Sequence, residues 1–206
     1  MKLPKRPLLL ITDRRQAVLP LAEVVTAALE GGCRWISFRE KDLPLSEQVA
    51  LAENLLPAVR RFAARLTLHG DVEAGEHFDG VHLAEGGDVR AARRRLGSEK
   101  LLGLSVHTPR QAALADPTLL DYVIAGPVYE STSKPGYGPA LGSAGIADFV
   151  HATTLPIIAI GGVIGAHIPE LIEAGVAGVA VMGSVMRASD PARVVGALIA
   201  ALKAAK

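Results

Sequence analysis

The stretch IIAIGGVIGAHIPELIEAGVAGVAVMG, residues 157–183, contains two short apolar runs separated by a longer segment. The runs, at 157–161 and 178–183, have the length of β-strands and lack the polar alternation of a half-exposed strand. Strands that are apolar throughout are typical of a parallel sheet whose two faces are both covered. The segment between them has the length of a helix. The stretch therefore predicts a strand–helix–strand unit with parallel strands.

The same pattern recurs along the whole chain. Apolar runs of strand length alternate with longer segments, and there are eight such runs: 8–12, 35–38, 66–69, 80–83, 101–105, 122–126, 157–161 and 178–183. Eight such units in 206 residues predict an α/β fold, a (β/α)₈ TIM barrel that forms one domain over residues 1–206. A doubly wound open sheet is the alternative, although such sheets usually have fewer strands at this length. Within the helical segment 45–66, Pro57 is expected to kink or divide the helix.

Charge and composition narrow the classes of partner. Lys and Arg number 22 against 21 Asp and Glu, so the usual electrostatic reason to expect a nucleic-acid partner is absent. The basic run RAARRRL at 90–96 falls on an expected helix and is interpreted as a solvated face rather than a phosphate-binding patch. No apolar stretch approaches the roughly 20 residues of a membrane span. We therefore expect no membrane contact and a cytoplasmic protein, whose single cysteine, Cys33, is buried and inert.

In a barrel of this type, the loops that follow the C-terminal ends of the strands carry the chemistry. The segment SFREKD, residues 37–42, follows the second strand and mixes two cations with two anions. It predicts either a self-neutralising turn or an anion clamp, in which Arg39 offers a forked guanidinium and Lys41 a point charge. The position in a barrel favours the clamp. Arg39 and Lys41 are therefore candidate substrate-binding residues, together with Ser37.

Histidines and acids follow the third and fourth strands. His69, Asp71, His82, Glu85 and Asp88 superficially resemble a metal site, but no compact ligand motif fixes their spacing, so we predict no protein-held metal. His82 lies in the middle of an apolar run and is expected to be a hydrogen-bonded core histidine. His69, at a strand end, is the better candidate for a site.

The fifth strand ends in LGLSVHTP, residues 102–109. Ser105 is expected to point towards the barrel mouth, and His107 follows it by two residues, so both are candidate hydrogen-bonding anchors for a substrate. A serine nucleophile would need an adjacent base and an oxyanion hole, and no elbow motif supplies them here. The stretch gives little support to hydrolase chemistry.

Glycine-bearing turns follow the seventh and eighth strands. Gly161 and Gly162 allow backbone amides to approach a ligand, and Gly183 and Ser184 begin the segment after the last strand. In barrels these two loops often bind phosphate through backbone N–H groups. We therefore predict a phosphate site here, with tight turns that bind no ligand as the alternative. The loop after the sixth strand, 126–142, ends in PGYGPALG, which is expected to act as a lid or its hinge.

The order of motifs along nearly the whole chain resembles one known superfamily. The segments ITD, SFREKD, HGDVE, DGVHLAEGGD, GLSVHT, GPVYESTSK, IAIGGV and GVAVMGSV are similar to those of the thiamine phosphate synthase and thiazole tautomerase (TenI-like) superfamily. Its members are (β/α)₈ barrels that handle the thiazole phosphate of thiamine biosynthesis. The resemblance implies a small phosphorylated substrate, and it leaves open whether the chain forms a homo-oligomer.

The resemblance to the synthases, which join a pyrimidine diphosphate to a thiazole phosphate, assigns roles by position. Arg39 and Lys41 match diphosphate-binding basic residues, and Ser37 stands where a glutamine is common. Ser105 matches a serine beside the pyrimidine site. Ser131 and Ser133 correspond to two hydroxyl residues of the synthases, and Lys134 corresponds to a diphosphate-binding lysine. Gly161, Met182 and Gly183 correspond to positions around the thiazole phosphate.

The departures from the synthase pattern concern the metal. Synthases carry one aspartate after the third strand and another after the fourth that hold Mg²⁺, and the matching residues here are Gly70 and Gly87. Asp71 and Asp88 each lie one residue further along, so a synthase with a displaced Mg²⁺ site is one alternative. Without the metal, a departing diphosphate would lose several kcal/mol of stabilisation.

The tautomerase branch needs no metal, because it moves a proton on a carboxythiazole phosphate. It often has glycine at the position of Gly70, so we expect a TenI-like, tautomerase-type protein with no cofactor. The histidine that serves as acid and base in that branch is replaced by Pro127, so His69 and His107 are the candidate catalytic residues. A non-catalytic binder of thiazole or thiamine phosphates is the third alternative.

Overall fold

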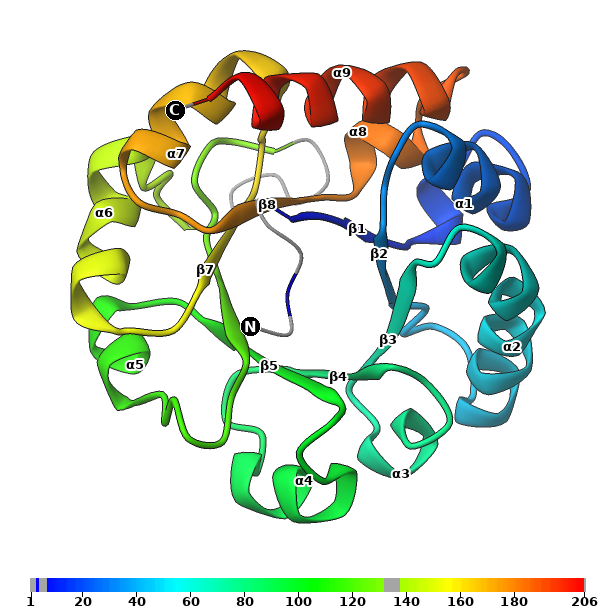
Figure 1. Ribbon diagram of the computed structural model, residues 1–206, viewed down its shortest axis with the longest axis horizontal. Coiled ribbons are helices and arrows are strands. Elements are labelled where there is room, and N and C mark those ends of the chain that lie inside the picture. The colour runs from blue at the N-terminus through cyan, green and yellow to red at the C-terminus, as the bar shows by residue number, and fades with distance from the viewer. Residues whose placement is uncertain (1–2, 4–6, 132–137, 206) are drawn as a thin grey trace.

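The computed structural model describes residues 3, 7–131 and 138–205. Its core is a closed barrel of eight parallel strands, each paired with its neighbours in chain order and the last paired with the first (Figure 1). The strands are β1 (Leu8–Ile11), β2 (Trp35–Phe38), β3 (Arg65–His69), β4 (Gly80–Leu83), β5 (Leu101–Val106), β6 (Tyr122–Ala125), β7 (Ile157–Ile160) and β8 (Gly178–Val181). The predicted TIM barrel is confirmed, and the open-sheet alternative is wrong.

The helices form a ring outside the barrel (Figure 1). They are η1 (Arg14–Gln16), α1 (Leu21–Glu30), α2 (Leu45–Arg61), α3 (Val72–Gly75), α4 (Val89–Leu96), α5 (Pro109–Leu114), α6 (Gly142–Ala152), η2 (Gly165–His167), α7 (Ile168–Glu173), α8 (Gly183–Met186) and α9 (Pro191–Ala204). Helix α2 continues through Pro57, so this proline does not divide the helix, and the kink expected as the other outcome stays a prediction. Within the described ranges, no helix has the length and apolar character needed to cross a membrane.

Side chains of the strands alternate between the barrel interior and the layer under the helices. On β2, Trp35 belongs to the interior cluster, whereas Ile36 and Phe38 belong to the large cluster between barrel and helices. The interior cluster consists of Leu3, Leu9, Ile11, Trp35, Leu101, Tyr122, Ile124, Ile158 and Ala180. Leu3 joins it from the N-terminal segment and is 6% exposed. The barrel is therefore a packed core, as this fold requires, with functional loops at its mouth.

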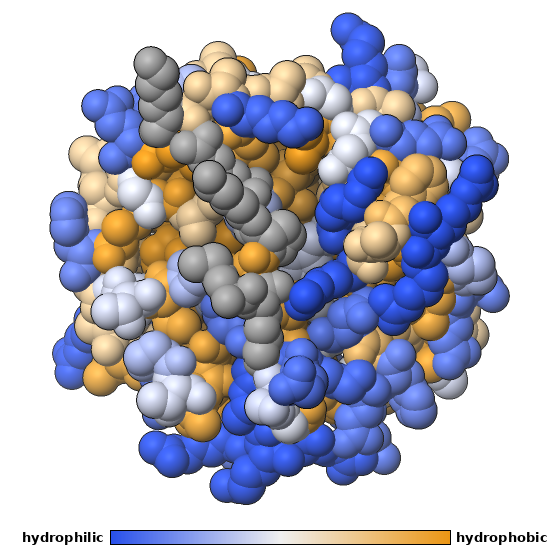
Figure 2. Space-filling model, viewed as in Figure 1, coloured by the Kyte–Doolittle hydropathy of each residue, from blue (hydrophilic) through white to orange (hydrophobic). Residues whose placement is uncertain are grey.

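Two expectations about the outer layer are confirmed. Cys33 is fully buried, and burial raises the pKa of its thiol to about 11. The basic run lies on α4, where Arg90, Arg94 and Arg95 are exposed, while Ala92 and Leu96 are buried. In the view of Figure 2, charged and polar side chains gather mostly along the lower and right-hand edges of the molecule. This distribution is typical of helices that pack their apolar faces inward and leave polar faces to solvent.

The loop after β6 lies against the loop after β7. Val128 N donates a hydrogen bond to Ile160 O at 2.8 Å, and Tyr129 N donates to Gly161 O at 3.0 Å. These bonds anchor the first part of the loop at the barrel mouth. Residues 132–137 lie outside the described residues, so the lid role expected for this loop stays a prediction.

Candidate functional site

A cavity of about 1020 Å³ opens at the C-terminal ends of the strands. Most residues that the sequence predicted for a site line it: Arg39, Lys41, His69, Ser105, His107, Ser131, Gly161, Gly162, Met182, Gly183 and Ser184. Ser133 and Lys134 lie outside the described residues, and their roles stay predictions. The barrel topology therefore brings residues from six strands and their loops into one place.

Ser37 is the predicted residue that the structure does not place in this lining. It lies on β2, in register with Ile11 of β1 and Thr67 of β3, and it is fully buried. Its Oγ has no hydrogen-bond partner among the described residues. Strand alternation puts Ser37 on the same side as Trp35, inside the closed barrel, and not in the loop that carries Arg39. The structure therefore places Ser37 inside the barrel and not in the cavity lining, and its contact with a substrate stays a prediction.

The loop after β2 separates its acids from its bases. Glu40 is buried and accepts a hydrogen bond from Arg14 N at 2.9 Å, while Asp42 accepts one from Arg14 Nη1 at 2.6 Å. The Arg14 guanidinium lowers the pKa of Asp42, whereas burial raises the pKa of Glu40. Arg39 and Lys41 line the cavity instead. The loop after β1 thus binds the two acids, and the two bases are placed where an anion clamp needs them.

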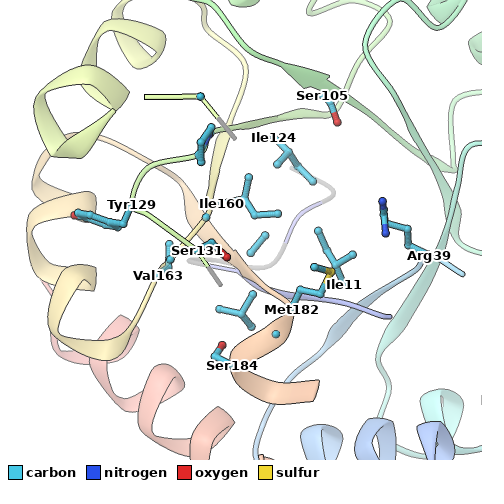
Figure 3. A pocket seen from close by; sticks show the side chains of 18 of the residues that line it. Ile11, Arg39, Ser105, Ile124, Tyr129, Ser131, Ile160, Val163, Met182 and Ser184 are labelled. Atoms are coloured by element: carbon cyan, nitrogen blue, oxygen red, sulfur yellow. The ribbon is translucent and has the colours of Figure 1, made fainter. Parts of the chain in front are cut away.

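The cavity has a basic wall and a small-residue wall with apolar side chains between them. Figure 3 shows Arg39 on one side and Ser184 on the other, with Ile11 and Met182 between them. Gly183 and Ser184 are the first residues of α8, which begins one residue after the end of β8. A ligand that fills the cavity therefore meets a cationic side chain at one end, hydroxyl and backbone groups at the other, and an apolar surface in the middle.

Packing alone explains why the two residues after β7, Gly161 and Gly162, are glycines. Gly161 has a φ of +103°, and a Cβ there would lie 2.8 Å from Pro127 Cα. Gly162 has a φ of +61°, and a Cβ there would lie 2.7 Å from Tyr129 Cβ. Both positions therefore require glycine for the close approach of the loop after β6, with or without a ligand. Phosphate binding at this wall stays a prediction.

The two candidate acid–base histidines lie in different parts of the cavity. His107 Nε2 lies 3.8 Å from Glu85 Oε2 at an exposed edge, where Gln111 also donates to the Glu85 carboxylate. The His69 ring lies deeper, with its centroid 5.1 Å from that of His82. The two histidines therefore have different surroundings, and their roles as acid and base stay predictions.

His82 is the core histidine that the sequence predicted. It is 1% exposed, and its ring nitrogens lie 3.3 Å from Tyr122 OH and 2.9 Å from Ser105 Oγ. Burial lowers its pKa to about 3, so the ring is neutral under ordinary conditions. His82 also lines the cavity, which the sequence did not indicate.

The described residues do not fit the Mg²⁺ site of the synthase pattern. Asp71 Oδ1 caps α3 by accepting from Ala74 N at 2.8 Å, and Asp88 Oδ1 caps α4 by accepting from Ala91 N at 2.9 Å. Neither acid lines the cavity. In the ranges 3, 7–131 and 138–205, no three His, Cys, Asp or Glu side chains come together in a way that could hold a metal ion. The hypothesis of displaced Mg²⁺ ligands is therefore not supported.

Sequence reasoning missed several lining residues. Arg187, at the C-terminal end of α8, lines the cavity and donates to Gln16. It follows Ser184 by three residues, so helical spacing could have placed it on the same side. Tyr129 lines the cavity, and its ring stacks on that of His167 with centroids 3.8 Å apart. No local pattern pointed to Tyr129, because its position depends on the pairing of two loops.

Comparisons with known proteins agree with this geometry. A family model described as thiamine monophosphate synthase matches residues 8–185. A putative thiamine-phosphate synthase of Geobacter sulfurreducens is 41% identical over 199 residues, which cover 95% of this chain and 93% of the relative. A thiamine-phosphate synthase of Roseiflexus sp. is 38% identical and covers 95% and 84%. The solved structure of a thiamine phosphate pyrophosphorylase from Pyrococcus furiosus has a TM-score of 0.83 at 28% identity, covering 96% and 95%.

These relatives overturn the expectation of a tautomerase-type protein. The similar proteins at 38% and 41% identity bear the name of the synthase and not of a tautomerase. The structure gives a physical reason that points the same way: Pro127, which has no side-chain group able to carry a proton, lines the cavity at the place of the tautomerase histidine. The alternative reading as a synthase is therefore favoured.

Proposed function

Since the chain belongs to the thiamine monophosphate synthase family, we propose that it joins hydroxymethylpyrimidine diphosphate to a thiazole phosphate and releases diphosphate. The observation that carries this proposal is a single cavity with two polar ends and an apolar middle. Each substrate combines an anionic group with an uncharged ring. A site for both at once needs two anion-binding ends and a surface on which the rings can pack.

The cavity offers a place for each group. Arg39 and Lys41 would hold the diphosphate, because a guanidinium and an ammonium group both bind phosphate oxygens strongly. Gly183 and Ser184 would hold the thiazole phosphate through backbone N–H groups and a hydroxyl. Ile11 and the other apolar side chains between these ends would contact the rings. This arrangement brings the reacting atoms of the two substrates together.

The reaction transfers the pyrimidinylmethyl group from an oxygen of the diphosphate to the nitrogen of the thiazole ring. The bond between the pyrimidine methylene carbon and the diphosphate oxygen breaks, and the oxygen keeps the electron pair. The thiazole nitrogen supplies the electron pair of the new carbon–nitrogen bond, and no proton has to be removed. Negative charge therefore grows on the diphosphate, next to Arg39 and Lys41, where fixed positive charge stabilises the transition state. The apolar middle of the cavity limits hydrolysis of the electrophilic carbon by water.

We propose that this reaction proceeds without a bound metal ion. Asp71 and Asp88 are both used as helix caps and do not line the cavity, and among the residues that the structure describes no group of three His, Cys, Asp or Glu side chains comes together that could hold Mg²⁺. Two cationic side chains of the clamp take over the neutralisation of the diphosphate. This part of the proposal is separable from the reaction itself and has its own test.

The test supplies both substrates to the purified protein and measures thiamine phosphate and diphosphate. We expect product with excess EDTA as well as with Mg²⁺. Lys41→Ala should lower kcat/KM at least tenfold, about 1.4 kcal/mol of transition-state stabilisation. Arg60→Ala is the matched control: Arg60 pairs with Asp79 at 2.7 Å at the end of α2 and does not line the cavity, so activity should persist.

The possible results separate the claims. Product that forms only with Mg²⁺ would contradict the metal-independent step and leave the synthase reaction standing. Absence of product with and without Mg²⁺ would refute the synthase proposal. Binding of both substrates without product would then identify the chain as a non-catalytic binder, the remaining alternative.

A further inference from the structure

Arg187 brings a guanidinium group to the wall of the cavity that carries Gly183 and Ser184. Of the residues that the structure describes, three Lys or Arg side chains line the cavity, and the other two, Arg39 and Lys41, follow β2. Arg187 comes three residues after Ser184, and its backbone N–H donates to Gly183 O at 3.0 Å at the end of α8. Arg187 therefore belongs to the end of the cavity where the proposed function places the thiazole phosphate.

Two successive hydrogen bonds tie this guanidinium to the loop after β1. Arg187 Nη1 donates to Oε1 of Gln16, the last residue of η1, and Gln16 Nε2 donates to Asp13 Oδ2 at 2.8 Å. Asp13 is 7% exposed, and its other oxygen, Oδ1, caps η1 by accepting from Arg15 N at 3.2 Å. The turn thus fixes the Asp13 carboxylate, and the carboxylate in turn fixes the Gln16 amide.

The chemistry of its two partners leaves the Gln16 amide only one orientation. A carboxylate accepts hydrogen bonds and a guanidinium donates them, so the amide turns its NH₂ group to Asp13 and its oxygen to Arg187. The reverse orientation would lose both bonds. Because Gln16 is neutral, this contact holds the guanidinium without neutralising its charge. The Arg14 guanidinium, in contrast, lies 2.6 Å from a carboxylate oxygen of Asp42.

We propose that Arg187 binds the phosphate group of the thiazole substrate, with Gln16 and Asp13 as its positioning residues, so that the cavity selects the phosphorylated thiazole over the corresponding alcohol. The inference rests on the proposed function and names the side chain that recognises the phosphate. A guanidinium offers phosphate oxygens a planar fork of N–H groups, and such charge-assisted hydrogen bonds are stronger than neutral ones. The backbone of Gly183 and the hydroxyl of Ser184 bring no net charge to offset that of the phosphate.

The first experiment measures binding by calorimetry, without the pyrimidine substrate and therefore without turnover. Wild type and Arg187→Ala are titrated with the thiazole phosphate and with the thiazole alcohol. We expect Arg187→Ala to raise the Kd of the phosphate about tenfold or more and to leave the Kd of the alcohol unchanged. Arg193→Ala is the matched control: Arg193 is an exposed arginine of α9 that lies 3.9 Å from Asp190 and does not line the cavity, so loss of its charge should change neither Kd.

The second experiment tests the positioning role of Gln16 in four proteins: wild type, Gln16→Met, Arg187→Ala and the double variant. Methionine keeps the length of the glutamine side chain and removes both amide groups. We expect Gln16→Met to raise the Kd of the thiazole phosphate about three- to tenfold, the effect of one hydrogen bond. In the Arg187→Ala background the same substitution should have no further effect, because the side chain that Gln16 positions is absent.

Each result either supports or overturns the inference. An unchanged Kd of the thiazole phosphate in Arg187→Ala, or an equal rise for phosphate and alcohol, would overturn it. An equal effect of Gln16→Met in both backgrounds would refute the positioning role, since a merely structural effect does not depend on Arg187.

The inference and the function on which it rests can fail separately. A wild type that binds the thiazole phosphate no more tightly than the alcohol would overturn the inference, even if it forms thiamine phosphate. A wild type that binds the phosphate through Arg187 but forms no product would refute the synthase proposal and leave the inference standing.

Discussion

Replacement of Gly161 by alanine tests how tightly the loops after β6 and β7 are packed. Gly161 and Gly70 have nearly the same backbone conformation, with φ of +103° and +104°. A Cβ at Gly161 would lie 2.8 Å from Pro127 Cα, whereas a Cβ at Gly70 would have no atom within 4 Å. The two substitutions therefore share the backbone strain and differ in the steric overlap.

The magnitudes follow from these two contributions. A left-handed backbone conformation costs an alanine about 1–2 kcal/mol, which both variants should show. Overlap with a backbone atom adds about 1–3 kcal/mol at Gly161 alone. For a chain of this size 1 kcal/mol corresponds to about 2–4 °C in Tm, so Gly161→Ala should melt roughly 2–12 °C below Gly70→Ala.

The assay is thermal unfolding of wild type, Gly70→Ala and Gly161→Ala under identical buffer conditions. Activity adds a second readout, because relief of the overlap must move Pro127, which lines the cavity. We expect Gly161→Ala to lose turnover in excess of its loss of stability, and Gly70→Ala to lose little. Equal Tm values for the two variants would refute the claim that the loop after β6 requires glycine at this position.

Three further predictions concern groups outside the catalytic proposal. Desolvation of Tyr129, together with its hydrogen bond to Glu170, raises the pKa of its phenol to about 12. The stability that the protonated phenol contributes should therefore be complete below pH 10 and lost between pH 10 and 12. The free energy of unfolding should depend less on pH in Tyr129→Phe over this range, and a profile identical to that of the wild type would contradict this. Cys33 is fully buried, and burial raises the pKa of its thiol to about 11. We expect the thiol to resist thiol reagents in the native protein and to react after denaturation, as measured by mass spectrometry. Stoichiometric labelling of the native protein would contradict this prediction. Pro57→Ala should raise the free energy of unfolding by about 1–2 kcal/mol, because alanine restores a backbone amide donor inside α2. Chemical denaturation measures this change. A loss of stability in the variant would show that the proline fits this helix without cost.

Much of the fold could be predicted because parallel barrel strands are covered on both faces. That burial produces the apolar runs at 35–38 and 80–83, which coincide with β2 and β4. The topology then places every strand-following loop at one mouth, which is why residues as distant as Arg39 and Ser184 could be assigned to one site.

The rest depends on contacts that no local pattern encodes. Arg14 binds Asp42 from 28 positions away, so the separation of acids from bases after β2 could not be read from SFREKD. The caps formed by Asp71 and Asp88 carried a signal that was available, since aspartate directly before a helix commonly accepts from the first turn. A helix cap uses the carboxylate of each aspartate, which argues against displaced Mg²⁺ ligands at these positions.

The burial of Leu3 determines which end of the chain is suited to a fusion partner or an affinity tag. Leu3 belongs to the interior cluster of the barrel, whereas α9 lies on the outer ring (Figure 1). A fusion partner or affinity tag joined directly ahead of Leu3 would pull on a residue of the barrel interior, while one joined beyond α9 would follow Ala205, which packs between barrel and helices, and would leave the interior cluster undisturbed. Immobilisation or a fluorescent fusion for the assays above should therefore use the C-terminal side.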